Sequence, residues 1–197
     1  LLVLFFGVSP ATAVGTDLLY ASLTKTVGGW VHGRRGTVDW KVVGLLGLGS
    51  LPAAVVTIAL LKYLGLDEKS LRSLVTGVLS VALLATAAAL LLKDQIKKLA
   101  RRKDGTVYEL HHRYLPAATI VTGIVVGALV TISSIGAGVL GTVALLFLYP
   151  RMPAVKVVGT DIVHAVPLTA LAGMGHMALG TVDLVLLLIK FYLLHAG

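Results

Sequence analysis

Long apolar runs separated by short polar segments dominate the chain. Runs with few or no charged residues cover about 41–64, 73–92, 116–132 and 155–177. Each approaches or exceeds the roughly 18–20 residues that an α-helix needs to cross the hydrocarbon core of a bilayer. The runs do not alternate strictly between apolar and polar residues, as a membrane β-barrel would require. The pattern therefore predicts an all-α fold, a polytopic transmembrane helix bundle.

Polar residues at the edges of these runs predict where two helices begin. Ser9 and Pro10 are typical of an N-cap and a first turn, and the helix that follows them reaches about Val31. Asp39 is placed to cap the helix at 41–64 in the same way. Both positions combine a side-chain acceptor with a following apolar run, which is the usual signature of a helix start.

The sequence at the beginning of the chain is repeated near its end. Residues 1–40 align without a gap with residues 145–184, and 14 of the 40 pairs are identical. The motif Val14-Gly15-Thr16-Asp17 is repeated as Val158-Gly159-Thr160-Asp161. The repeat ends with the sequence Gly-Thr-Val-Asp in both copies, at 36–39 and 180–183. A repeat in a chain this apolar indicates a membrane protein built from two related halves.

The repeat divides the chain into three parts. We assign residues 1–92 to the first half, 93–115 to a basic loop, and 116–197 to the second half. The first copy lacks the segment that precedes the second copy, and the second copy stops matching after residue 184. We therefore expect that the N-terminal part of the first half and the C-terminal part of the second half are missing.

The net charge of +8 comes from basic residues concentrated at the ends of apolar runs. That placement indicates membrane topology rather than nucleic-acid binding, because loops rich in Lys and Arg stay in the cytoplasm. Residues 93–115 are then cytoplasmic, as is the loop with Arg34 and Arg35. The matching loop at 175–185 has no Lys or Arg and falls outside, which predicts an inverted repeat, the common plan of secondary transporters. If 135–150 is instead a re-entrant segment that leaves on its entry side, the repeat is parallel.

A run of small residues lies between two of the apolar segments. Ser133-Ser134-Ile135-Gly136-Ala137-Gly138 predicts a broken or re-entrant Gly-rich helix, followed by a short helix that begins near Val139. The N–H groups and dipole at that N-terminus favour an anion. Non-helical backbone within a membrane survives only inside protein or beside water. The alternative is close helix packing by small residues.

Ionisable residues inside the apolar segments are the other candidates. Lys25 either attracts an anionic substrate or extends its ammonium to the membrane surface. Asp17 and Asp161 serve either proton coupling or a structural role shared by both copies. For His164 and His176, satisfied hydrogen bonding or a place at the membrane interface is favoured over function. Twelve residues separate these histidines, which is not a metal-binding spacing. The absence of cysteine excludes disulfides, thiol catalysis and thiolate metal sites, and no cofactor is predicted.

With these motifs in view, the chain resembles the sulfite exporter TauE/SafE family, also called the 4-toluene sulfonate uptake permease family. The resemblance rests on the doubled Gly-Thr-Asp and Gly-Thr-Val-Asp motifs, on Thr24-Lys25, and on the Gly-rich segment before Val139. It covers nearly the whole chain. It implies a multi-pass permease of the bacterial inner membrane that moves small anionic sulfur or carboxylate compounds, such as sulfite, thiosulfate, sulfonates or sulfoacetate.

We therefore predict a secondary transporter of a small organosulfur or sulfite-like anion, with an anion channel or an intramembrane enzyme as alternatives. The predicted partners are the anion and the lipid bilayer, without nucleic acid, and self-association is left open. The candidate substrate-binding residues are Lys25, Thr24, Ser133, Ser134, Gly136, Gly138 and Thr169. The candidates for a coupling or structural role are Asp17, Asp161, His164 and His176. No catalytic or metal-binding residue is predicted.

Overall fold

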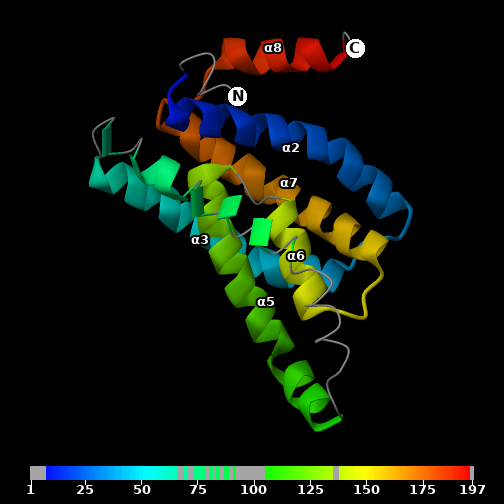
Figure 1. Cartoon of the computed structure of the whole chain (residues 1–197). Helices are drawn as coiled ribbons and strands as arrows, with labels where there is room; N and C mark the ends of the chain where they lie inside the picture. Colours follow the sequence, from blue (N-terminus) through cyan, green and yellow to red (C-terminus); the bar gives the residue numbers. More distant parts are fainter. Residues whose placement is uncertain are drawn as a thin grey trace.

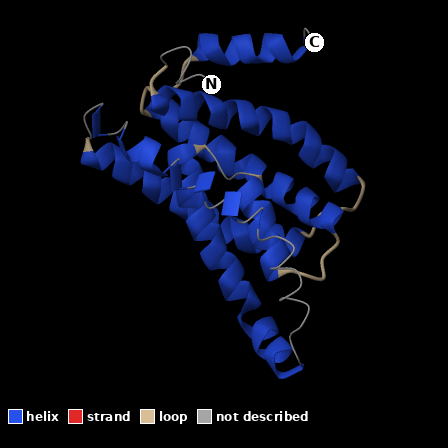
Figure 2. Cartoon of the chain, in the orientation of Figure 1, coloured by secondary structure: helices blue, strands red, loops and turns tan. Residues whose placement is uncertain are grey.

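A computed structural model gives the arrangement of the chain. It describes residues 8–65, 69–70, 73–78, 80–81, 83–84, 87–88, 91, 105–134 and 138–195. Within these residues every regular element is an α-helix, as Figures 1 and 2 show, which confirms the predicted all-α fold. The labelled helices are α2 (Pro10–Arg34), α3 (Trp40–Leu64), α5 (Gly105–Ser133), α6 (Val139–Leu148), α7 (Ala154–Ala178) and α8 (Leu184–His195).

The two predicted helix starts are confirmed. The Ser9 hydroxyl accepts the N–H of Thr12 at 3.2 Å, and Pro10 occupies the first turn of α2. The Asp39 carboxylate accepts the N–H of Val42 at 3.3 Å at the start of α3. Each cap pairs one of the backbone donors that a helix N-terminus leaves without a partner.

Two helices extend beyond their predicted bounds. The membrane span predicted at 116–132 corresponds to Tyr114–Ser133, but α5 already begins at Gly105, so the last part of the segment 93–115 is helical rather than loop. Helix α2 continues to Arg34, past the predicted end at Val31. In both cases the predicted boundary was set where the apolar run ends. Polar and basic residues can continue a helix beyond that point at little cost in helix propensity. The rest of the segment 93–115 lies outside the described residues.

Helices α2 and α7 lie side by side and run in opposite directions (Figure 1). Gly15 near the start of α2 packs against His176 near the end of α7, and Gly159 near the start of α7 packs against His32 near the end of α2. Glycine permits this approach, because an added Cβ on Gly15 would lie only 3.0 Å from the Cβ of His176. The two copies of the repeat are therefore in direct contact along these helices.

Helix α3 packs against α5 and α7 and completes the interior. Its backbone touches that of α5 where glycines face the neighbouring chain: a Cβ on Gly49 would lie 2.8 Å from the Ile124 nitrogen, and one on Gly127 would lie 2.7 Å from the Ser50 Cα. Helix α8 lies along α2 (Figure 1). The rings of Tyr20 and Phe191 meet edge to face between these two helices, with centroids 5.4 Å apart.

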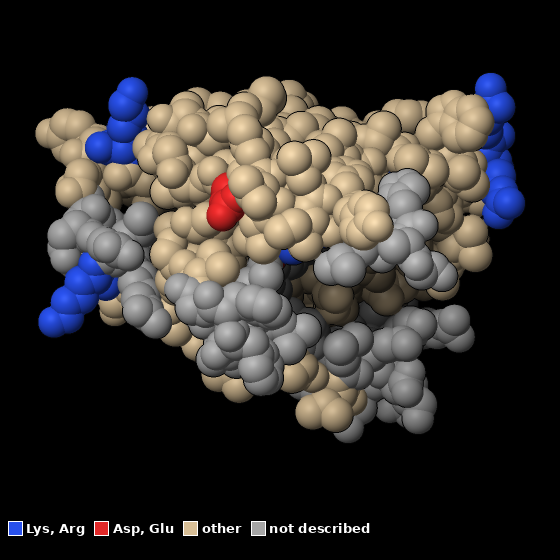
Figure 3. Space-filling model, turned by 90° about the horizontal axis from the view of Figure 1, so that it is seen from above, with Lys and Arg blue, Asp and Glu red and all other residues tan. Residues whose placement is uncertain are grey.

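Three of the described helices are long and apolar enough to cross a membrane: α3, the Tyr114–Ser133 part of α5, and α7. Large apolar side chains cover their outer surfaces, including Leu48 on α3 and Val121 on α5, which are 67% and 58% exposed. Figure 3 shows a face on which the charged residues that are drawn lie mainly toward the edges. Such an exterior suits lipid rather than water. Helix α2 equals α3 in length but is more polar, so its place in a bilayer depends on its packing against α7.

Candidate functional site

The helix break predicted from the small residues is present between α5 and α6. Helix α5 ends at Ser133, and α6 begins at Val139. Ser134 adopts a left-handed backbone conformation with φ of 55°, which costs a non-glycine residue roughly 1–3 kcal/mol and ends the helix. Gly136 lies outside the described residues, and the re-entrant path of this segment stays a prediction.

Lys25 lies against the start of α6. It is half-buried on α2, and a Cβ added to Gly138 would lie 3.5 Å from its Nζ atom. Among the described side chains, none caps the N-terminus of α6. The first backbone N–H groups of this short helix therefore sit beside an ammonium group, so two sources of positive potential converge there.

Asp161 on α7 faces the same end of α6. The Thr142 hydroxyl donates to Oδ2 of Asp161 at 2.9 Å, and the Gly141 backbone lies directly against the carboxylate, which leaves no room for a side chain at that position. Asp161 is only 2% exposed. Lys25, against Gly138, and Asp161, against Gly141, therefore lie at the same end of α6 and form the charged centre of the site.

His164 adds a contact to α3. Its Nε2 atom lies 2.8 Å from the Ser50 hydroxyl, and both residues are buried. The charge of Lys25 also reaches this imidazole. We call the set the central polar cluster, and its side chains come from α2, α3, α6 and α7. Its members are Lys25, Ser50, Thr142, Asp161 and His164, with Gly138 and Gly141 beside them.

Three predicted hydroxyl ligands use their protons inside their own helices. Thr24 donates to the carbonyl of Tyr20 at 2.9 Å, and Thr169 donates to that of Ala165 at 2.8 Å. Ser133 donates to the carbonyl one turn earlier in α5 at 2.7 Å. In this conformation their hydroxyl hydrogens point to the backbone rather than toward Lys25. The structure thus brings Lys25 and Gly138 together, whereas the hydroxyl hydrogens of Thr24 and Thr169 are taken up by their own helices.

Asp17 lies outside the central polar cluster, although it is the repeat counterpart of Asp161. Its carboxylate pairs with the Lys190 ammonium on α8, and its side chain is 42% exposed. The ammonium also lies 5.4 Å from the centre of the Tyr20 ring. The two aspartates of the repeated motif therefore have different environments, which the motif alone does not reveal.

The repeated threonine and aspartate tie the two halves together at both ends of the α2–α7 pair. The Asp39 N–H donates to Oγ1 of Thr160 at 2.9 Å, and the Asp183 N–H donates to Oγ1 of Thr16 at 3.1 Å. Each bond joins the turn of one copy to the helix of the other. We call these contacts the Asp39 clasp and the Asp183 clasp.

Each clasp also contains a histidine–threonine pair. His32 Nδ1 lies 2.8 Å from the Thr37 hydroxyl, and His176 Nδ1 lies 2.9 Å from the Thr181 hydroxyl. His176 Nε2 additionally lies 2.8 Å from the carbonyl oxygen of Thr131 on α5. Both histidines thus make hydrogen bonds, and they shape the turns against which the repeated glycines pack.

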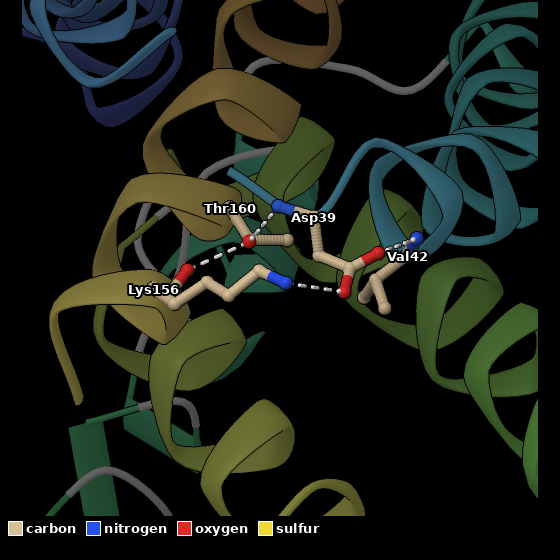
Figure 4. Close-up of polar contacts among 4 residues, drawn as sticks. All are labelled: Asp39, Val42, Lys156 and Thr160. Atoms are coloured by element: carbon tan, nitrogen blue, oxygen red, sulfur yellow. Dashed lines mark hydrogen bonds and ion pairs between the residues drawn. The ribbon is translucent and has the colours of Figure 1, made fainter. Parts of the chain in front are cut away.

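The Asp39 clasp carries an ion pair that has no basis in the repeat. Lys156 Nζ lies 3.0 Å from Oδ2 of Asp39 (Figure 4), whereas the residue equivalent to Lys156 in the first copy is Thr12. Figure 4 also shows the Lys156 carbonyl accepting from Thr160, at 2.7 Å, beside the clasp bond. Partial burial raises the pKa of Asp39, but the Lys156 hydrogen bond and charge and the Val42 N–H together hold it below its usual range.

Sequence reasoning missed Ser50 and Thr142. Each is an isolated hydroxyl within an otherwise apolar stretch, and that isolation is the available signal, because such a group must find a partner inside a membrane helix bundle. Among the described residues, no three His, Asp or Glu side chains converge as ligands for a metal.

Comparisons with known proteins agree with this architecture. A family model described as sulfite exporter TauE/SafE matches residues 1–197. The chain is 33% identical over 185 residues to a protein of Bacillus subtilis (strain 168) named "Probable membrane transporter protein YjnA". That alignment covers 94% of this chain and 72% of the relative. No solved structure matches the chain.

Proposed function

Because the chain belongs to the sulfite exporter TauE/SafE family of membrane transporters, we propose that it is a secondary transporter of small organosulfur or sulfite-like anions. The membrane in which it works is, in this proposal, the bacterial inner membrane. The substrate class follows the family description and the charge of the central polar cluster, and the relative's own name specifies no substrate.

The observation that carries the proposal is the position of Lys25 against the uncapped N-terminus of α6. A sulfite or sulfonate group presents three oxygens and one or two negative charges. The ammonium can pair with one oxygen while backbone N–H groups beyond Gly138 donate to the others, as helix N-termini do for many oxyanions. Such an arrangement suits a small, compact anion better than a large one.

The alternative of an anion channel predicts an open path past Lys25. The buried carboxylate of Asp161, which accepts from the half-buried Thr142, supports a carrier instead, because a buried ionisable group must rearrange during each transport cycle. The turnover separates the two functions, since channel conductance lies far above carrier rates. An intramembrane enzyme would release a chemically altered product, so recovery of the anion unchanged excludes that alternative.

The direct test is flux through the purified protein in lipid vesicles. Uptake of labelled sulfite, thiosulfate and methanesulfonate is compared between the wild type and Lys25→Gln. Loss of a charge-assisted hydrogen bond costs about 1.5–3 kcal/mol, so we expect Lys25→Gln to weaken apparent affinity or flux by roughly ten- to a hundredfold.

Lys41→Gln is the matched control, because Lys41 is an exposed lysine on α3 and its loss should leave uptake unchanged. Equal flux in the wild type and Lys25→Gln would remove the lysine from the mechanism. The absence of flux for all three anions in the wild type would remove the proposed substrate class.

A further inference from the structure

The sequence left two aspartates as candidates for a coupling ion, and their surroundings now separate them. Asp17 is partly exposed and pairs with Lys190 on α8, away from the α6 N-terminus. Asp161 is 2% exposed, receives the Thr142 hydroxyl and lies against Gly141 in the first turn of α6, three residues from Gly138, whose backbone lies beside Lys25. A buried carboxylate without a compensating charge is costly, so the state of Asp161 must depend on what Lys25 faces.

Among the described groups around Asp161, Lys25 carries the opposite charge. From α6 the carboxylate meets the neutral Thr142, and α3 presents the neutral Ser50 to His164 rather than to Asp161. Helix α5 offers α7 a backbone carbonyl, that of Thr131, through His176. His164 lies one turn along α7. The positive charge of Lys25 opposes a proton on its ring, because that proton would add a second positive charge to the cluster.

We propose that the substrate anion displaces Asp161 from the charge of Lys25, and that Asp161 binds a proton when the anion binds. This inference rests on the proposed function and names its coupling ion. Without substrate, the ammonium and the carboxylate balance each other. With a monovalent anion bound, the ammonium is balanced by the anion, and the protonated Asp161 is neutral. One proton therefore travels with each anion, and the protein returns empty with its carboxylate ionised.

The stoichiometry is measured in vesicles whose membrane potential is clamped at zero with potassium and valinomycin. The probes are methanesulfonate and thiosulfate, because their charges do not change near neutral pH and cannot deliver a proton. If sulfite alone is carried, it serves as the probe. With the outside one pH unit more acidic, one-to-one coupling should raise the anion concentration inside to about tenfold that outside. At equilibrium the inside-to-outside ratio of the anion equals the outside-to-inside ratio of protons. A pH dye enclosed in the vesicles records protons entering with the anion.

The variant Asp161→Asn removes the proton-binding carboxylate and preserves its shape. We expect it to lose accumulation driven by the pH gradient while it still exchanges labelled for unlabelled anion across the membrane. Asp17→Asn is the matched control on the repeat-equivalent residue, and it should accumulate the anion as the wild type does.

The outcomes separate this inference from the proposed function. Wild-type anion flux without proton entry overturns the inference and leaves the transporter function in place, and this reading does not depend on any variant folding. Accumulation retained in Asp161→Asn also overturns it, including when sulfite is the probe. A wild type that moves none of the anions contradicts the proposed function itself.

Discussion

Asp39 combines two roles in one side chain. One carboxylate oxygen caps α3 through the Val42 N–H, and the other pairs with Lys156 on α7. The first role depends on an oxygen acceptor, which asparagine also supplies, whereas the second depends on charge. The two contributions can therefore be separated by one substitution.

Replacing Asp39 by Asn should lower the stability of the protein at neutral pH by less than about 1 kcal/mol, because the ion pair is partly exposed. The pKa of Asp39 is depressed in the folded protein. Its contribution is therefore complete above the unfolded value of about 3.9 and is lost as the pH falls through the folded value. Thermal unfolding in detergent at pH 7 and pH 3 checks this: the variant should differ from the wild type at pH 7, and the difference should be smaller at pH 3.

Asp183→Asn is the control, since the second copy's cap also accepts a helix N–H, from Leu186 at 3.0 Å, and Thr12 stands where the repeat would place a lysine. A difference for Asp39→Asn that persists unchanged at pH 3 would assign the effect to the cap rather than to the ion pair.

For single residues, the sequence predicted a role where the residue type and its immediate neighbours are enough to imply it. Ser9 and Asp39 were identified as caps because a short polar side chain precedes an apolar run. Lys25 was identified because a charged side chain inside an apolar helix is costly in a membrane and therefore indicates a function. Ser50 and Thr142 were missed because their partners, His164 and Asp161, come from other helices, and local sequence carries no record of that proximity.

Among the elements, the contact between α2 and α7 depends on glycine in both copies. A Cβ on Gly159 would lie 2.8 Å from His32 Nδ1, and one on Gly15 would lie 3.1 Å from the Val182 side chain. Both positions face the turn of the other copy. A Cβ on Gly28, by contrast, would meet only ordinary contact with Ile162, at 3.5 Å.

The substitutions Gly159→Ala and Gly15→Ala should therefore each destabilise the protein by about 1–3 kcal/mol, the usual cost of overpacking. Gly28→Ala should be neutral or stabilise slightly, because alanine favours a helix by about 0.5–1 kcal/mol over glycine. Thermal unfolding of the three variants in the same detergent tests the comparison. Equal stability of all three would mean that the clasp turns yield at little cost.

Helix positions could be predicted from the sequence better than helix packing. The apolar runs located α3, α6 and α7 to within one or two residues. The start of α5 was misplaced because hydropathy reports burial in lipid, not backbone conformation. The repeat indicated that two halves are related, but the exchange of contacts between their turns depends on three-dimensional packing.

For the whole molecule, α2 and α7 run antiparallel, which is the arrangement that an inverted repeat requires. The orientation of the halves across a bilayer is still a prediction from the distribution of Lys and Arg. It places the segment 93–115 and the loop after α2 in the cytoplasm, and the loop after α7 on the opposite side.

Single cysteines can test this topology, because the chain has no cysteine of its own. Arg34 and Ala178 are repeat-equivalent, exposed residues at the ends of α2 and α7. In intact cells, a membrane-impermeant thiol reagent should label Ala178→Cys and leave Arg34→Cys unmodified until the membrane is permeabilised. Labelling of both from the same side would contradict a transmembrane, antiparallel arrangement of α2 and α7.

The two clasps lie at opposite ends of one helix pair, so each can act as a separate gate. If the halves rock during transport, one end can open only by breaking its own aspartate–threonine bond, while the other end serves as the pivot. Each end also carries an ion pair between the two copies: Lys156 with Asp39 at one end, and Lys190 with Asp17, next to Thr16, at the other. Loss of a partly exposed pair worth up to about 1 kcal/mol should ease the opening of its own end by up to roughly fivefold. With the predicted topology, loss of the Lys156 pair would favour the inward-facing protein.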